Sequence, residues 1–349
     1  MIDKSYIKLG NRKIGETFPP LVIPEVGINH EGNIEKAFKL IDSAKSVGAE
    51  IIKFQCHITD KEMIKTDDKP GKISNETLWS IIKRCEFTEE QEFKIKNYCS
   101  KKNISYLSTP FSKEAAERLY RIGVDGFKIG SGECNNYPLI KYICNFNKPL
   151  IVSTGMNSIL SIKKTVSLLK ERKIKFCLLH CTSMYPTPYD KVRLGGISEL
   201  KKNFKNTPIG LSDHSQNIWT CLGGVALGAS ILEKHFTISR SWPGPDMPVS
   251  IEPMELKDLI VGSKAVWQAK GGKKNILNEE IPVIKFAYAS VVSIKNIKKG
   301  EVFSESNIWV KRPGKGYYKA EDFQKLIGKK SKKFIKKDTY INKNDVLSQ

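Results

Sequence analysis

A repeated alternation of short apolar segments with amphipathic segments constrains the fold of this 349-residue chain more than any other feature. Each apolar segment has the length of a strand, and in the stretch that follows it apolar residues recur every three or four positions. Eight such segments follow one another, at residues 17–27, 49–55, 104–109, 125–130, 149–153, 175–181, 208–212 and 229–236. This order predicts a (β/α)8 barrel of parallel strands, with a doubly wound parallel sheet as the alternative.

The helices are predicted from the spacing of apolar residues between these segments. In the first helix, apolar residues recur from Ile34 through Phe38 and Ile41 to Val47, and Gly48 then ends it. The same reasoning predicts helices at residues 76–102, 112–122, 136–146, 158–172 and 216–228, and a further one that ends near residue 205.

The character of the sequence changes after the eighth unit. The remaining chain consists of short apolar segments and turns, such as SVVSIKNIKKGEVF, rather than helical patterns. We predict a barrel domain over residues 1–278, a linker over 279–284 and a small, mostly β domain over 285–349. A domain of about 65 residues buries little apolar surface and is marginally stable alone.

The chain is strongly basic, with a formal net charge of +21. Residues 285–349 contain 16 Lys and Arg against 6 Asp and Glu, which raises the possibility of a nucleic-acid partner. Lysine runs such as residues 329–333 lack the interleaved aromatic residues that stack on bases, however. A solvated lysine-rich surface, which also attracts anionic substrates, is the favoured interpretation, and we expect no nucleic-acid partner.

The cysteines and the apolar segments indicate a cytoplasmic protein that does not cross a membrane. The eight cysteines are scattered singly and form no C-x-x-C pair, so we expect free thiols. The N-terminus is charged and lacks the apolar stretch of a signal peptide. The longest apolar run, Cys221–Leu232, is too short to span a bilayer.

Polar residues recur where the predicted strands end. In a barrel of this type the catalytic residues come from the carboxyl ends of different strands. Those ends, read in chain order, carry Glu25, Lys53, Gln55, Thr109, Lys128, Ser131, Glu133, Ser153, Ser183, Tyr185, Ser212, His214, His235 and, further on, Asp246. Any one of these has an ordinary structural explanation, but their recurrence at one end of successive strands predicts a site.

The residue types at these ends indicate the chemistry. Two lysines, Lys53 and Lys128, with several hydroxyl groups suit a small multiply charged anion, such as a phosphate ester that also carries a carboxylate. No nucleotide-binding glycine motif is present, which argues against a nucleotide. His214 and His235 are either a structural pair or, with a nearby carboxylate such as Asp246, the ligands of a catalytic divalent metal that remains open to substrate.

Eight ordered motifs resemble one family. PEVGINHEGN, IIKFQCHI, LSTPFS, KIGSGECNNYPL, STGMNS, HCTSMYPTP, GLSDHS and EKHFT are similar to those of the sialic acid synthases, and the segment from residue 289 resembles the antifreeze-like (SAF) domain attached to that barrel. The resemblance covers nearly the whole chain. It implies condensation of phosphoenolpyruvate with N-acetylmannosamine to give N-acetylneuraminic acid and phosphate, with Mn²⁺ or Mg²⁺ as the cofactor. It also implies a domain-swapped homodimer.

The resemblance also implies roles for individual residues. Glu25, Lys53, Lys128, His214 and His235 would be catalytic, and both histidines would bind the metal. Phosphoenolpyruvate would contact Lys53, Thr109, Lys128, Ser131, Ser153, Ser183 and Ser212. The acceptor sugar would contact Gln55, Glu133, Tyr185, Asp246, Phe286 and, from the other subunit, Arg312. Glu25 would lie between the two substrates and move protons.

The sequence departs from the better-known bacterial members of that family around the acceptor. Phe54 and Cys56 flank Gln55 where His and Thr are usual, and Ser183 replaces a common Asn. The segment 238–253 also differs. Legionaminic, pseudaminic or another nonulosonic acid is therefore the alternative product. A metal-dependent aldolase or hydrolase and a polyanion-binding protein are further alternatives.

Overall fold

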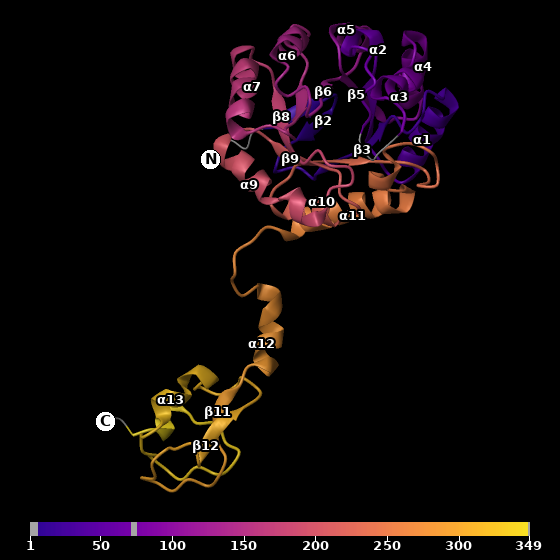
Figure 1. Ribbon diagram of the computed structural model, residues 1–349. Coiled ribbons are helices and arrows are strands. Elements are labelled where there is room, and N and C mark those ends of the chain that lie inside the picture. Colours follow the sequence, from indigo (N-terminus) through magenta and orange to yellow (C-terminus); the bar gives the residue numbers. More distant parts are fainter. Residues whose placement is uncertain (1–5, 71–74, 348–349) are drawn as a thin grey trace. The chain divides into compact units, whose positions relative to one another are not determined.

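The computed structural model describes residues 6–70 and 75–347 (Figure 1). The chain divides into two compact units, Met1–Gly271 and Gly272–Gln349. The first unit contains the alternating strands and helices. The predicted linker at 279–284 falls within the second unit, where residues Ile281–Ala287 form helix α12.

Eight parallel strands form the sheet of the first unit. They are β3 (Leu21–Gly27), β4 (Ile51–Cys56), β5 (Ser105–Pro110), β6 (Phe127–Ile129), β7 (Leu150–Ser153), β8 (Phe176–Cys181), β9 (Ile209–Asp213) and β10 (Ile231–His235). Their hydrogen-bonded order is β5-β4-β3-β10-β9-β8-β7-β6. The outermost two, β5 and β6, also pack against each other, so the sheet curls into a nearly closed barrel. The predicted (β/α)8 barrel is confirmed and the doubly wound sheet is wrong.

Helices surround this barrel (Figure 1). They are α1 (Ile34–Ser46), α2 (Thr59–Glu62), α3 (Leu78–Cys85), α4 (Glu89–Lys101), α5 (Lys113–Arg121), α6 (Tyr137–Cys144), α7 (Ile159–Glu171), α8 (Tyr189–Val192), α9 (Gly195–Asn203), α10 (Trp219–Ala226) and α11 (Pro253–Ala269). Leu40 and Ile41 of α1 pack with Ile52 of β4 in the large core between strands and helices. The strands are almost entirely buried because both faces of the sheet are covered.

The single helix predicted at residues 76–102 is wrong. The segment forms two helices, and Glu86 and Thr88 between them have extended backbone conformations. The Thr88 side chain accepts a hydrogen bond from the backbone N–H of Gln91, and the Gln91 side chain accepts one from that of Thr88. This capping box starts a new helix, and such a local signal outweighs continuous apolar spacing.

An unpredicted hairpin closes the amino-terminal end of the barrel. Strands β1 (Ile7–Leu9) and β2 (Arg12–Ile14) pair antiparallel. Their apolar side chains join an inner core with the first residues of three barrel strands, a cluster that includes Ile7, Leu9, Ile14, Leu21, Ile51 and Ile231. The opposite end of the barrel, where the strands finish, is left for polar side chains.

The second unit is small and has its own core. Strands β11 (Ser290–Ser293) and β12 (Ile308–Lys311) pair antiparallel, isolated bridges extend this pairing, and α13 (Phe323–Leu326) packs against it. Val291, Phe303, Leu326 and Ile341 are among the residues that form the core. None of the helices described in either unit is long and apolar enough to cross a membrane.

Candidate active site

A cavity of about 580 Å³ opens at the carboxyl ends of the barrel strands. Twelve of the predicted site residues line it: Glu25, Lys53, Gln55, Thr109, Lys128, Ser131, Ser153, Ser183, Tyr185, Ser212, His214 and His235. They come from all eight strands or from the turns that follow them, because parallel strands end at a common edge. The structure therefore brings most of the predicted site together.

Two lysines and two glutamates form one side of the cavity, which we call the lysine side (Lys53, Lys128, Glu25 and Glu233). Lys53 Nζ lies 2.7 Å from Glu25 Oε2 and donates to Thr109 Oγ1 at 3.2 Å. Lys128 Nζ donates to Ser153 Oγ at 2.7 Å. Both ammonium groups are almost completely buried, each with a side-chain exposure of 3% or less. Buried ammonium groups beside hydroxyls can bind an anion, because the anion compensates for the solvation that these charges lose on burial.

Glu233 is a central residue of the lysine side that the sequence analysis missed. Its carboxylate oxygens lie 3.8 Å from Lys53 Nζ and 3.6 Å from Lys128 Nζ, and it accepts a hydrogen bond from Ser212 at 3.1 Å. The signal was present, because side chains alternate along a strand and Glu233 is two residues before His235 on β10. Both side chains therefore face the cavity.

The surroundings of the two glutamates shift their pKa values in opposite directions. Burial and the nearby Glu233 together raise the pKa of Glu25 to about 6, against the lowering effect of the Lys53 charge. Burial also opposes ionisation of Glu233, but Lys128 and Lys53 outweigh it and hold its pKa below the usual value. Burial lowers the pKa of Lys128 below the ordinary lysine value. Of the two glutamates, Glu25 is therefore the one that can exchange a proton near neutral pH.

His214 and His235 line another part of the cavity, and Asp246 lies next to His235; we call these three residues the histidine side. The two imidazole centres lie 5.4 Å apart. Burial, together with the positive charges around it, lowers the pKa of His235 well below 6.5, so its ring is neutral. Burial alone would lower the pKa of His214 as well, but contacts with Cys181 and the Thr182 carbonyl hold it above the ordinary value.

The nitrogen atoms of these rings fit a metal site. His214 Nδ1 lies 2.8 Å from the Thr182 carbonyl oxygen and donates its hydrogen to it. The electron pair on Nε2 is therefore available to a ligand, and this atom lies 3.0 Å from the Tyr185 hydroxyl. His235 Nδ1 is buried without a hydrogen-bond partner among the described residues, and Asp246 Oδ2 lies 3.6 Å from it. Within the same described part of the chain, no cluster of three or more His, Cys, Asp or Glu side chains is arranged to hold a metal ion. Two imidazoles would thus leave most coordination positions to water and substrate.

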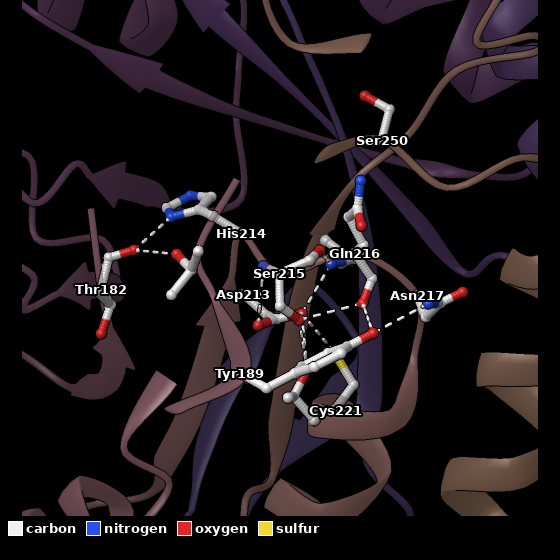
Figure 2. A network of polar contacts seen from close by, with 12 residues as sticks. Thr182, Tyr189, Asp213, His214, Ser215, Gln216, Asn217, Cys221 and Ser250 are labelled. Carbon is white, nitrogen blue, oxygen red and sulfur yellow. Dashed lines mark hydrogen bonds and ion pairs between the residues drawn. The ribbon is translucent and has the colours of Figure 1, made fainter. Parts of the chain in front are cut away.

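Behind His214, a network centred on Asp213 fixes the turn (Figure 2). The Asp213 carboxylate accepts hydrogen bonds from Ser215, Thr220 and Lys234, with the Lys234 Nζ at 2.7 Å. Asp213 and Lys234 point away from the cavity, because they alternate with Ser212 and Glu233 along their strands. Figure 2 shows His214 on the same turn, bonded to Thr182 on the other side. The ion pair between Asp213 and Lys234 and the turn together set the orientation of the His214 imidazole.

Four predicted residues do not line the cavity. Asp246 is placed behind His235 rather than at the cavity wall, and burial raises its pKa to about 6. Glu133, on the turn after β6, accepts a hydrogen bond from Asn136 at 2.5 Å. Phe286 and Arg312 belong to the second unit, where Phe286 is 62% exposed on α12 and Arg312 follows β12. Their roles stay predictions.

The remaining histidines and the cysteines are outside the predicted chemistry. His30 stacks on Phe87, and His180 bonds to the Val192 carbonyl. His57, however, contacts Gln55, a connection that no sequence pattern indicated. All eight cysteines are free, as predicted, and all are buried.

Comparisons with known proteins agree with this geometry. Residues 40–275 match the NeuB family, and residues 288–347 match the SAF domain. An N,N'-diacetyllegionaminic acid synthase of Campylobacter jejuni is 38% identical over 92% of this chain and 98% of its own length. The human N-acetylneuraminate-9-phosphate synthase is 32% identical over 95% of this chain and 93% of its own length.

A solved structure shares the architecture. The N-acetylneuraminic acid (sialic acid) synthetase of Leptospira borgpetersenii, in complex with citrate, superposes with a TM-score of 0.73 at 35% identity. The match covers 80% of this chain and 95% of that one.

Proposed function

The chain belongs to the NeuB family of condensing synthases, and we propose that it joins phosphoenolpyruvate to the open-chain aldehyde of an acylamino sugar. Carbon 3 of phosphoenolpyruvate attacks the aldehyde carbon, water adds at carbon 2, and the resulting tetrahedral intermediate releases phosphate. The product is a nonulosonic acid. The observation that carries this proposal is the pair of buried lysines, Lys53 and Lys128, which face one cavity beside two imidazoles.

The lysine side suits phosphoenolpyruvate. The substrate carries a phosphate and a carboxylate, and the two ammonium groups and the hydroxyls of Thr109, Ser153 and Ser212 can hold both groups. Ser131 and Ser183, near the cavity rim, extend this set of hydroxyls. Because these donors already point into the cavity, they can exchange their present partners for the substrate and stabilise the charge that moves toward the leaving phosphate.

Glu25 is placed to move protons between the substrates. Lys53 and Gln55 hold its two oxygens, and its pKa of about 6 lets it exist in both protonation states near neutral pH. As a base it would take a proton from the attacking water. A Glu25→Gln variant should remain folded and bind phosphoenolpyruvate but turn over very slowly, and wild-type turnover would contradict this role.

The histidine side is proposed as the place of a divalent metal, Mn²⁺ or Mg²⁺. His235 Nδ1, buried without a partner in the described structure, and His214 Nε2 are the atoms that would hold it. When bound, the metal supplies a Lewis acid for the acceptor aldehyde. Thr182 and the Asp213 network keep the His214 ring in place for this purpose.

The acceptor is proposed to be N-acetylmannosamine, with Gln55 and Tyr185 at the cavity wall and Asp246 beside His235. Glu133, on the turn after β6, remains a proposed contact of the acceptor. A 2,4-diacetamido sugar is the second candidate, because the Campylobacter relative at 38% identity is a diacetyllegionaminic acid synthase. The unusual neighbours of Gln55, Phe54 and Cys56, are both buried and are not among the residues that line the cavity.

We further propose a cytoplasmic, domain-swapped homodimer in which the partner subunit's Arg312 reaches the acceptor and Phe286 lines the same seam. Apolar side chains on and beside α12, including Phe286 and Val283, are half or more exposed and would be covered by such an arrangement. Eight free thiols fit a reducing compartment.

A phosphate-release assay tests the main proposal. The protein is incubated with phosphoenolpyruvate and each of a panel of sugars, including N-acetylmannosamine and 2,4-diacetamido sugars, with and without a chelator. We expect release that requires both substrates and stops on chelation. Release without any sugar would indicate a phosphatase, and activity that survives exhaustive chelation would refute the metal.

A further inference from the structure

His57 lies one layer behind the cavity and ends a chain of side-chain contacts that leads to Glu25. Its Nε2 is 2.9 Å from Gln55 Oε1, and Gln55 Nε2 donates to Glu25 Oε1 at 2.9 Å. Residues Lys53, Gln55 and His57 continue the alternation of β4 past the end of the strand, so all three share one face. Gln55 lines the cavity and His57 does not.

The His57 ring is fixed from two directions. Its Nδ1 lies 2.9 Å from Glu62 Oε1 on α2, and both side chains are at most 5% exposed. The ring also stacks on Phe111, with centres 4.6 Å apart and planes within 10°. Helix α2 is itself held at its first residue, because the side chain and backbone N–H of Thr59 both donate to Glu86. The imidazole therefore has one orientation.

This orientation determines which end of the Gln55 amide faces the cavity. A primary amide can rotate by half a turn, which swaps the positions of its oxygen and its NH₂ group. The contact of His57 Nε2 with Gln55 Oε1 needs a hydrogen on Nε2, and the contact of Nδ1 with Glu62 Oε1 needs one on Nδ1, so the inferred ring carries a hydrogen on each nitrogen. With Nε2 as a donor, the amide oxygen stands beside it and the NH₂ group points to the Glu25 carboxylate. With the amide reversed, its oxygen would face that carboxylate and the two acceptors would repel each other.

We propose that His57 is a positioning residue that holds the Gln55 amide with its NH₂ group toward Glu25 and so sets the acceptor side of the site. This inference rests on the proposed function for its substrate, a sugar with hydroxyl and acylamino groups. Such a ligand distinguishes a wall that donates hydrogen bonds from one that accepts them, whereas phosphoenolpyruvate contacts the lysine side. His57 therefore acts on the affinity for the sugar and not on that for phosphoenolpyruvate.

Two substitutions separate positioning from packing. His57→Gln places an N–H where Nε2 stands, toward Gln55, whereas His57→Asn places one where Nδ1 stands, toward Glu62. We expect His57→Asn to raise KM for the sugar about tenfold, the effect of one lost hydrogen bond. His57→Gln should remain within about threefold, and KM for phosphoenolpyruvate should stay within about twofold in both. Equal sugar KM values in the two variants would overturn the inference.

A spectroscopic measurement decides the inference without turnover. The Gln55 side-chain amide resonance in the full-length protein is identified by its loss in Gln55→Leu, and its hydrogen exchange with water is followed. We expect slow exchange in the wild type and in His57→Gln, and exchange at least about tenfold faster in His57→Asn. Unchanged exchange in His57→Asn would overturn the inference. An inactive wild type would refute the proposed function but leave this measurement valid.

His180→Gln is the matched control. His180 is also buried, and its Nε2 bonds the Val192 carbonyl at 2.7 Å, but it lies outside the chain to Glu25. We expect this variant to change neither the sugar KM nor the Gln55 exchange. A shift as large as that of His57→Asn would show a general packing effect and overturn the inference.

Discussion

The two sides of the cavity differ in how their charges are paired. On the lysine side, each ammonium group has a carboxylate within 4 Å, so the charges are balanced within the protein, although Glu233 Oε2 forms no hydrogen bond with the described residues. On the histidine side, His235 Nδ1 has no hydrogen-bond partner among the described residues, and Asp246 is 3.6 Å away. A balanced site is ready for a charged substrate that exchanges partners, whereas an incomplete one is ready for a ligand that supplies new bonds.

The largest expected effect is on the lysine side. Lys128→Met removes a buried ammonium group that is bonded to Ser153 and faces Glu233. We expect kcat/KM for phosphoenolpyruvate to fall about a thousandfold, because a preorganised charge on the transferring group is lost. Steady-state kinetics at varied phosphoenolpyruvate concentration measure this kcat/KM. If the variant keeps more than about a tenth of the activity, the lysine side does not bind the anion.

The next effect tests the internal charge balance of the lysine side. Glu233→Gln leaves Lys53 and Lys128 with one carboxylate fewer, and we expect the free energy of unfolding to fall by about 3 kcal/mol. Phosphoenolpyruvate should then raise the melting temperature of the variant more than that of the wild type, since it replaces the lost charge. If phosphoenolpyruvate raised the melting temperature of the variant and of the wild type equally, Glu233 would not balance the charge of the two lysines.

On the histidine side, His235→Asn should weaken Mn²⁺ binding. We expect about a hundredfold loss of kcat, with KM for phosphoenolpyruvate little changed, because the ligand atom belongs to the other side of the cavity. Titration of the protein with Mn²⁺, followed by electron paramagnetic resonance, measures the binding directly. Unaltered Mn²⁺ affinity would contradict a metal role for this imidazole.

A smaller effect comes from His30, a buried imidazole outside the cavity. Burial lowers its pKa from 6.5 to about 3, and Gly32 N donates to its Nδ1. Only the unfolded chain binds a proton between those values, so stability is lost as pH falls below 6.5. The loss is about 2 kcal/mol at pH 5.

His30→Gln keeps an acceptor for Gly32 and has nothing to titrate there. Denaturant unfolding at pH 7 and pH 5 should therefore show a smaller decrease for the variant. An equal decrease would mean that burial does not keep this imidazole neutral, and would weaken the same argument for His235.

The fold was largely predictable because the barrel repeats one simple pattern. Strand and helix periodicity located all eight barrel strands, and the ends of those strands located the lysines and both histidines. Family and enzyme class were predicted from motifs in the same places, and the comparisons confirm both. These features are local, or follow from the rule that parallel strands end together.

What could not be predicted depends on contacts between distant segments. The β1–β2 hairpin was missed because its short, charged sequence carries no strong strand signal. Glu233 was overlooked although its position on β10 indicated an inward side chain. The contact of His57 with Gln55 depends on a rotamer set by Glu62 and Phe111, and no sequence pattern reports that.

The β1–β2 hairpin has a kinetic consequence. Its apolar side chains fill the barrel at the amino ends of the strands, so substrates are expected to enter and leave through the carboxyl end. Lys53 and Lys128 are nearly inaccessible there, whereas Tyr185 is 37% exposed at the mouth. A ligand on the lysines would be trapped beneath one at Tyr185. We therefore expect an ordered binding mechanism, in which the anion binds before the sugar.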